Sequence, residues 1–176
     1  MRAALLFFAL TLTACGEMRA PPAAREQSAA SRALVFNAAS ETARNFTGDL
    51  TLEGPRLSFA KGATLVTQPL ARREPVEPIA QGGPSFAAAA LGPPDIAVEV
   101  RRVTAQSLVQ GAPSLCSSGG SPTYVALIYG QRSTRVTLMV FNGADAPGQS
   151  ASKSWLCATY VYTAPDGVRT RQGVLL

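Results

Sequence analysis

Few residues in this chain have side chains that could do chemistry. The sequence has 176 residues, with 16 Lys and Arg against 11 Asp and Glu, three Cys and no His. The absence of histidine excludes Ser-His-Asp and Cys-His catalysis and any imidazole-ligated metal site. The carboxylates suggest no paired acid and base, because Glu74 and Glu77 each precede a proline, and Asp95 and Glu99 would diverge along a strand. We therefore expect no catalytic residue, no metal ligand and no cofactor.

Ser150 and Lys153 match an S-x-x-K string, which is also found in penicillin-binding proteins and serine β-lactamases. In those families the serine opens a helix, so that a lysine one turn later can accept its proton. Here the string lies in a loop rich in Gly and Ser, and neither an S-D-N nor a K-T-G string accompanies it. We expect a surface loop at this position rather than an active site.

The N-terminus carries an uncharged, largely apolar run, residues 3–14, between Arg2 and Cys15. A membrane-spanning helix needs about 20 residues, so the run is too short to span a bilayer but fits the apolar region of a secretory signal. The string Leu12–Cys15 resembles the lipobox of bacterial lipoproteins. The resemblance implies removal of residues 1–14 as a signal peptide, attachment of diacylglycerol to the Cys15 thiol, and acylation (for example with palmitate) of the new amino group.

The residues after Cys15 bear on where such a lipoprotein would lie. No Asp follows Cys15, the residue that retains lipoproteins in the inner membrane of enteric bacteria. The resemblance thus implies a cell-envelope protein anchored through its lipid to the membrane, at the periplasmic face of the outer membrane. Residues 15–32 are rich in Ala, Pro, Arg and Ser and are predicted to be a flexible tether. Residues 33–176 are predicted to be a single domain.

Cys116 and Cys157 remain once Cys15 carries lipid. An even number of cysteines in an oxidising compartment predicts a disulfide between them. They form no C-x-x-C pair, which argues against a redox site. We expect a structural disulfide that stabilises the fold by about 4 kcal/mol.

The charge of the chain limits its partners. Removal of residues 1–14 takes away Arg2 alone and leaves a basic chain. An exported domain does not ordinarily meet nucleic acid, so we expect an envelope protein or an anionic envelope component as the partner, and a monomeric chain. Arginine pairs such as Arg101 and Arg102 are scattered and are predicted to be solvated.

Short alternating segments recur about every ten residues, which is typical of an all-β antiparallel sandwich or small barrel. One short helix is expected at 85–91, with Ser85 as its N-cap. The proline-rich segment 69–84 should hold no central strand, although part of it could run along an edge. The expected strands are 34–36, 48–53, 56–59, 63–67, 95–103, 124–129, 134–141 and 155–163, with another in 168–176.

A long polar loop, residues 142–154, is predicted to be exposed and mobile, which makes it the candidate binding loop. Its candidate residues are Asn142, Asp145 and Lys153. Strand alternation after the loop predicts that Trp155 and Cys157 share a face and that the indole packs over the disulfide. The aromatic residues of the C-terminal half should fill the core, with a ligand platform as the alternative.

These features predict a non-catalytic binding or structural module of the cell envelope. One alternative is a β-barrel carrier of a small apolar or anionic ligand, by analogy with lipocalin-like barrels. Another is an envelope defence protein similar in architecture to lysozyme inhibitors, which are also small disulfide-bonded lipoproteins. The positive charge of this chain opposes that alternative, because lysozyme is itself strongly basic.

Overall fold

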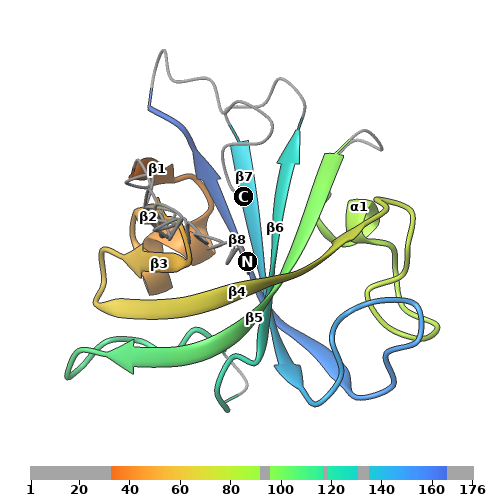
Figure 1. Ribbon diagram of the computed structural model, residues 1–176. Helices are drawn as coiled ribbons and strands as arrows, with labels where there is room; N and C mark the ends of the chain where they lie inside the picture. Colours follow the sequence, from red (N-terminus) through yellow and green to blue (C-terminus); the bar gives the residue numbers. More distant parts are fainter. Residues whose placement is uncertain (1–32, 92–95, 117–118, 131–134, 166–176) are drawn as a thin grey trace, which may run out of the picture. The chain divides into compact units, whose positions relative to one another are not determined.

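The domain is a closed barrel of eight antiparallel strands. The computed structural model describes residues 33–91, 96–116, 119–130 and 135–165. Each strand pairs with the next along the chain, and β8 pairs with β1 to close the barrel (Figure 1). The prediction of an all-β fold is confirmed, and of the two predicted architectures the structure is the barrel and not the sandwich. The predicted signal peptide (1–14), the predicted tether (15–32) and the strand expected in 168–176 lie outside the described residues.

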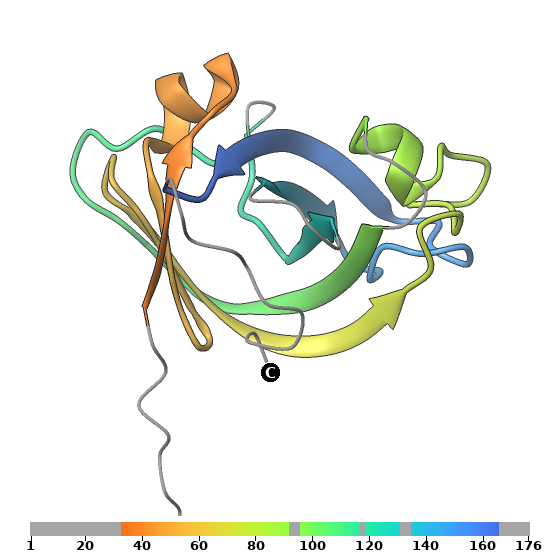
Figure 2. The same ribbon diagram turned by 90° about the horizontal axis from the view of Figure 1, so that it is seen from above.

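The strands are β1 (Leu34–Ala38), β2 (Leu50–Glu53), β3 (Arg56–Phe59), β4 (Ala63–Arg73), β5 (Ile96–Leu108), β6 (Tyr124–Gly130), β7 (Arg135–Gly143) and β8 (Ser154–Thr163). A five-residue π-helical turn, η1 (Ala43–Thr47), joins β1 to β2, and a short helix, α1 (Phe86–Ala89), lies between β4 and β5. Seen from above in Figure 2, β4 and β5 curve together around one side of the barrel. The turn η1 was not expected from the sequence.

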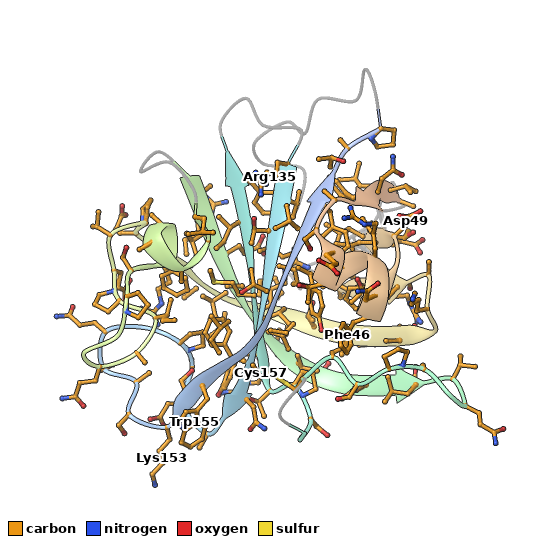
Figure 3. The ribbon with its side chains drawn as sticks, turned by 180° about the vertical axis from the view of Figure 1, so that it is seen from behind. Phe46, Asp49, Arg135, Lys153, Trp155 and Cys157 are labelled. Atoms are coloured by element: carbon orange, nitrogen blue, oxygen red, sulfur yellow. A yellow bond between two sulfur atoms is a disulfide. The ribbon has the colours of Figure 1, made fainter. Side chains whose placement is uncertain are left out.

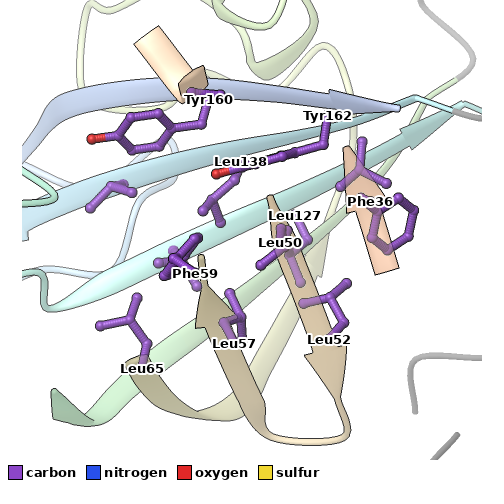
Figure 4. Packing of buried hydrophobic residues seen from close by; sticks show 14 of the residues in the cluster. Phe36, Leu50, Leu52, Leu57, Phe59, Leu65, Leu127, Leu138, Tyr160 and Tyr162 are labelled. Carbon is purple, nitrogen blue, oxygen red and sulfur yellow. The ribbon is translucent and has the colours of Figure 1, made fainter. Parts of the chain in front are cut away.

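Large apolar side chains occupy the interior of the barrel. Successive residues of a strand point to opposite faces, and the inward set forms one continuous buried cluster (Figure 4). In β7 the inward residues are Val136, Leu138 and Val140, as their alternation predicts. The largest inward side chains are Phe36, Leu50, Leu52, Leu57, Phe59, Leu65, Leu127, Tyr160 and Tyr162.

A second apolar cluster covers the outer face of β5, β6 and β7. The segment 74–91, including α1, packs there through Ile79, Phe86 and Ala90 against outward residues such as Val98 and Ile128. Because these strands are buried on both faces, β6 and β7 carry nearly continuous apolar runs rather than alternating ones. The packing of segment 74–91 on the outer face thus explains why the outward residues of β6 and β7 are apolar.

The predicted helix is confirmed in a shorter form. The Ser85 hydroxyl accepts a hydrogen bond from the backbone N–H of Ala88 at 3.2 Å, as an N-cap does. The α-helical residues are only Phe86–Ala89, and Leu91 takes a left-handed φ of 50°. The helix is held in place by Phe86, which is fully buried against the barrel wall.

β4 extends further than predicted, through Pro69 and as far as Arg73. Its first residues lie between β3 and β5, but β3 pairs with it only as far as Val66. Residues 67–73 therefore pair with β5 alone, with a register shift between Pro69 and Ala71. A proline is tolerated in such a one-sided segment because it interrupts only one ladder. The proline-containing part of β4 is thus an edge, as the sequence allowed.

Candidate functional site

The two cysteines of the domain are bonded to each other. Cys116 and Cys157 form a disulfide with a Cα to Cα distance of 5.0 Å, which joins the segment before β6 to β8. This confirms the predicted pairing. Cys116 is buried and belongs to the barrel core, so the bond fastens the 109–123 connection to the barrel wall.

Trp155 lies near a β-bulge and is exposed. The bulge, between Val140 and Phe141, leaves Cys157 as the extra residue, since Phe141 pairs with Leu156 and Val140 with Ala158. It interrupts the two-residue alternation of β8, and Cys157 packs against the barrel core. The indole is 59% exposed, and it lies against Gly143 on the neighbouring strand. The packing of its ring over the disulfide stays a prediction.

The loop 142–154 is fastened along much of its length, contrary to the expectation of a wholly exposed loop. The Gly148 N–H donates to the Ile79 carbonyl at 3.0 Å, and the Gln81 N–H donates to the Ala151 carbonyl at 2.9 Å. The Gln149 N–H donates to the Glu77 carboxylate at 3.2 Å. Pro147, Gly148 and Ala151 are accordingly buried. The loop therefore packs on the segment that also carries α1.

Asp145 organises the end of this loop through the hydrogen bonds that its carboxylate accepts. One of its carboxylate oxygens accepts hydrogen bonds from the Lys153 N–H at 2.8 Å and from the Ser152 N–H and hydroxyl at 3.0 and 3.2 Å. The backbone hydrogen bonds from Lys153 and Ser152 lower the pKa of the Asp145 carboxyl. Ser150 lies in this folded loop and opens no helix, unlike the serine of an S-x-x-K active site.

The structure brings two of the three candidate loop residues together with Trp155. Asn142 pairs with Trp155 across β7 and β8, which places the two side chains on the same face of the sheet. Lys153 is exposed and lies two residues before Trp155. We call Asn142, Lys153 and Trp155 the Trp155 face. Figure 3 shows Lys153 and Trp155 at the opposite end of the barrel from Arg135.

The interior of the barrel also holds a buried charged pair that the sequence reading placed in solvent. On β5 the apolar residues Val98 and Val100 point outward to the second cluster, so Glu99 and Arg101 point inward. The Arg101 side chain is 1% exposed and that of Glu99 is 12% exposed. Their ion pair, from Nε to Oε1, measures 2.9 Å.

Arg101 also links β5 to a distant turn. Its Nη1 donates to the carbonyl of Gly54, in the turn between β2 and β3, at 2.9 Å. The next residue of that turn, Pro55, accepts hydrogen bonds from the N–H and hydroxyl of Thr67 on β4, both at 2.8 Å. The prediction that Arg101 is solvated is wrong, because the turn and the barrel wall enclose it.

Tyr129 completes an interior polar cluster with this pair. It lies on β6 opposite Ala97, two residues from Glu99 on the same inward face of β5. Its hydroxyl oxygen is buried and has no hydrogen-bond partner among the described residues. Burial raises the pKa of Tyr129, the positive charge of Arg101 lowers it, and the negative charge of Glu99 raises it further. The phenol therefore stays protonated and remains a hydrogen-bond donor.

The two other interior tyrosines differ from Tyr129 in this respect. The Tyr160 hydroxyl donates to the carbonyl of Leu115 at 2.8 Å, and the Tyr162 hydroxyl lies 2.8 Å from that of Thr47 in η1. Burial raises the pKa of Tyr160 to about 12. These aromatic residues fill the core, as the sequence analysis favoured, whereas Trp155 does not.

Comparison with known proteins adds no functional assignment. The chain matches no family model, no curated protein and no solved structure. Within the described residues, no helix is long and apolar enough to cross a membrane. No group of three or more His, Cys, Asp or Glu residues in that part of the chain is placed to hold a metal ion.

Sequence reasoning missed the interior polar cluster for a definite reason. The alternation of β5 separates Val98 and Val100 from Glu99 and Arg101, and the structure keeps that separation. The usual assumption that the charged set faces water fails, because the segment 74–91 covers the apolar set from outside. A signal was present in the continuous apolar run of β6, which indicates a strand buried on both faces.

Proposed function

We propose that this protein is a lipid-anchored binding module of the bacterial cell envelope, held to the membrane through Cys15, and that it docks an envelope protein through the Trp155 face. The observation that carries the docking proposal is that the indole of Trp155 is exposed, while hydrogen bonds and the disulfide hold the backbone on either side of it. Exposed tryptophans are enriched among the residues that dominate protein interfaces. Lys153 beside it favours a partner that carries negative charge there.

The framework around Trp155 supports binding without large rearrangement. Gly143, with a φ of 132°, gives the indole space. A side chain at this position would meet both the Trp155 ring and the Lys153 carbonyl. Asp145 fixes the backbone of Lys153, and the disulfide fastens β8 two residues after Trp155. A side chain that is already positioned loses less conformational entropy when a partner binds.

Site-specific photocrosslinking tests this proposal. A benzoyl-phenylalanine placed at Lys153 should give a discrete adduct with one envelope protein in intact cells. The same group at Arg56, which is exposed at the start of β3, is the matched control and should give none. The Lys153 adduct should disappear when Trp155 is changed to Ala. No adduct at Lys153, or an adduct that is independent of Trp155, would contradict docking through this face.

The small-ligand carrier is the second candidate, and one observation supports it. The barrel interior contains the polar cluster of Glu99, Arg101 and Tyr129, and polar groups within an otherwise apolar interior are typical of ligand sites. The lysozyme-inhibitor alternative has no comparable support.

A further inference from the structure

We propose that the interior polar cluster binds a hydroxyl group between Tyr129 and Glu99, supplied by a buried water or by a small neutral ligand. The inference rests on the second candidate function and not on the Trp155 face. The two sites lie at opposite ends of the barrel, because Tyr129 pairs with Val136 near the start of β7 and Trp155 pairs with Asn142 near its end.

The first step is the unmet hydrogen bond of Tyr129. A buried hydroxyl without an acceptor is destabilising, and native proteins rarely keep one. Tyr160 and Tyr162 show how this barrel treats buried phenols, because each has a partner at 2.8 Å. The hydroxyl oxygen of Tyr129 is also buried, but it has no hydrogen-bond partner among the described residues. An acceptor supplied from outside the chain meets this need.

The second step is the chemical class of that acceptor. Tyr129 lies opposite Ala97 and Glu99 lies opposite Leu127, so the two are diagonal neighbours on the inward face, and Glu99 is paired with Arg101 at 2.9 Å. Glu99 and Arg101 already neutralise each other, so a further buried ion would have no counter-charge of its own. A neutral hydroxyl accepts from the phenol through its oxygen and donates its proton to the Glu99 carboxylate. One atom thus satisfies both neighbours without adding charge.

The third step is access. The Glu99 side chain keeps 12% of its surface exposed, whereas Arg101 keeps 1%. Glu99 is therefore the member of the ion pair that solvent reaches, and the proposal places the entry of the hydroxyl on its side. Arg101, held by Glu99 and the Gly54 carbonyl, forms the inner wall of the site.

The test compares Tyr129→Phe with Tyr162→Phe in the full-length protein purified from bacterial membranes. Thermal unfolding of both variants is measured, and native mass spectrometry reports any molecule bound to the wild type. Tyr162→Phe removes the hydrogen bond to Thr47. Its melting temperature gives the loss of stability expected when a buried phenol loses a hydrogen-bond partner. If a hydroxyl is bound, Tyr129→Phe should lower the melting temperature by a similar amount, about 3 °C.

The mass spectra separate the two sources of the hydroxyl. A bound mass on the wild type that is lost from Tyr129→Phe, together with the lower melting temperature, identifies a ligand. The lower melting temperature without any bound mass identifies a buried water. A Tyr129→Phe variant that melts at or above the wild-type temperature overturns the proposal, because removing a phenol oxygen that binds nothing relieves a buried unpaired group.

Discussion

Changing Glu99 to Gln is expected to lower the free energy of unfolding by about 3–5 kcal/mol, because it removes the carboxylate that pairs with the buried guanidinium of Arg101. Arg101 is 1% exposed, so water cannot replace the carboxylate. The measurement is urea denaturation of the purified protein. Glu53, which is exposed at the end of β2, gives the matched control, and Glu53→Gln should change stability by less than about 0.5 kcal/mol.

A double variant separates the loss of the pair from the loss of packing. Glu99→Gln combined with Arg101→Met removes the buried charge altogether, and it should recover a large part of the stability lost in Glu99→Gln. A Glu99→Gln variant as stable as the Glu53→Gln control would show that the pair is solvated in the folded protein. That result would also remove the basis for a hydroxyl site beside Tyr129.

Changing Cys116 and Cys157 together to Ala is expected to cost about 4 kcal/mol of unfolding free energy. The disulfide closes a loop with a sequence separation of 41, and its loss frees the unfolded chain more than the folded barrel. Urea denaturation again gives the measurement. Reduction of the wild type with dithiothreitol should produce a similar loss, and the double Ala variant should not respond to the reductant.

Thiol counting on the unreduced protein provides an independent check of the bond. Neither Cys116 nor Cys157 should react with a thiol reagent after unfolding without reductant. Two reactive thiols, or a double Ala variant as stable as the wild type, would contradict a stabilising disulfide.

The strand pattern of the domain could be predicted from sequence because it depends on local alternation. The segments 48–53 and 56–59 alternate, and they contain β2 (Leu50–Glu53) and β3 (Arg56–Phe59). The disulfide was predictable for a different reason, since two cysteines in a domain that is predicted to be exported leave a single pairing. The choice between a sandwich and a barrel depends on whether β8 meets β1, which no local pattern reveals.

The candidate site was less predictable because it depends on contacts between distant segments. Alternation divides Glu99 and Arg101 from Val98 and Val100, but only the packing of Phe86 on the outer face decides which set points inward. The bulge at Cys157, which interrupts the alternation of β8, was also not predicted. Bulges leave no clear mark in a single sequence.

Mass spectrometry of the N-terminus of the protein isolated from bacterial membranes tests the proposed cell-envelope role most directly. If Cys15 is the lipid anchor, the chain should begin at Cys15 and carry diacylglycerol on its thiol, with a further acyl chain where the host adds one. A chain that begins with unmodified Met1 would contradict export, membrane anchoring and the envelope partner together.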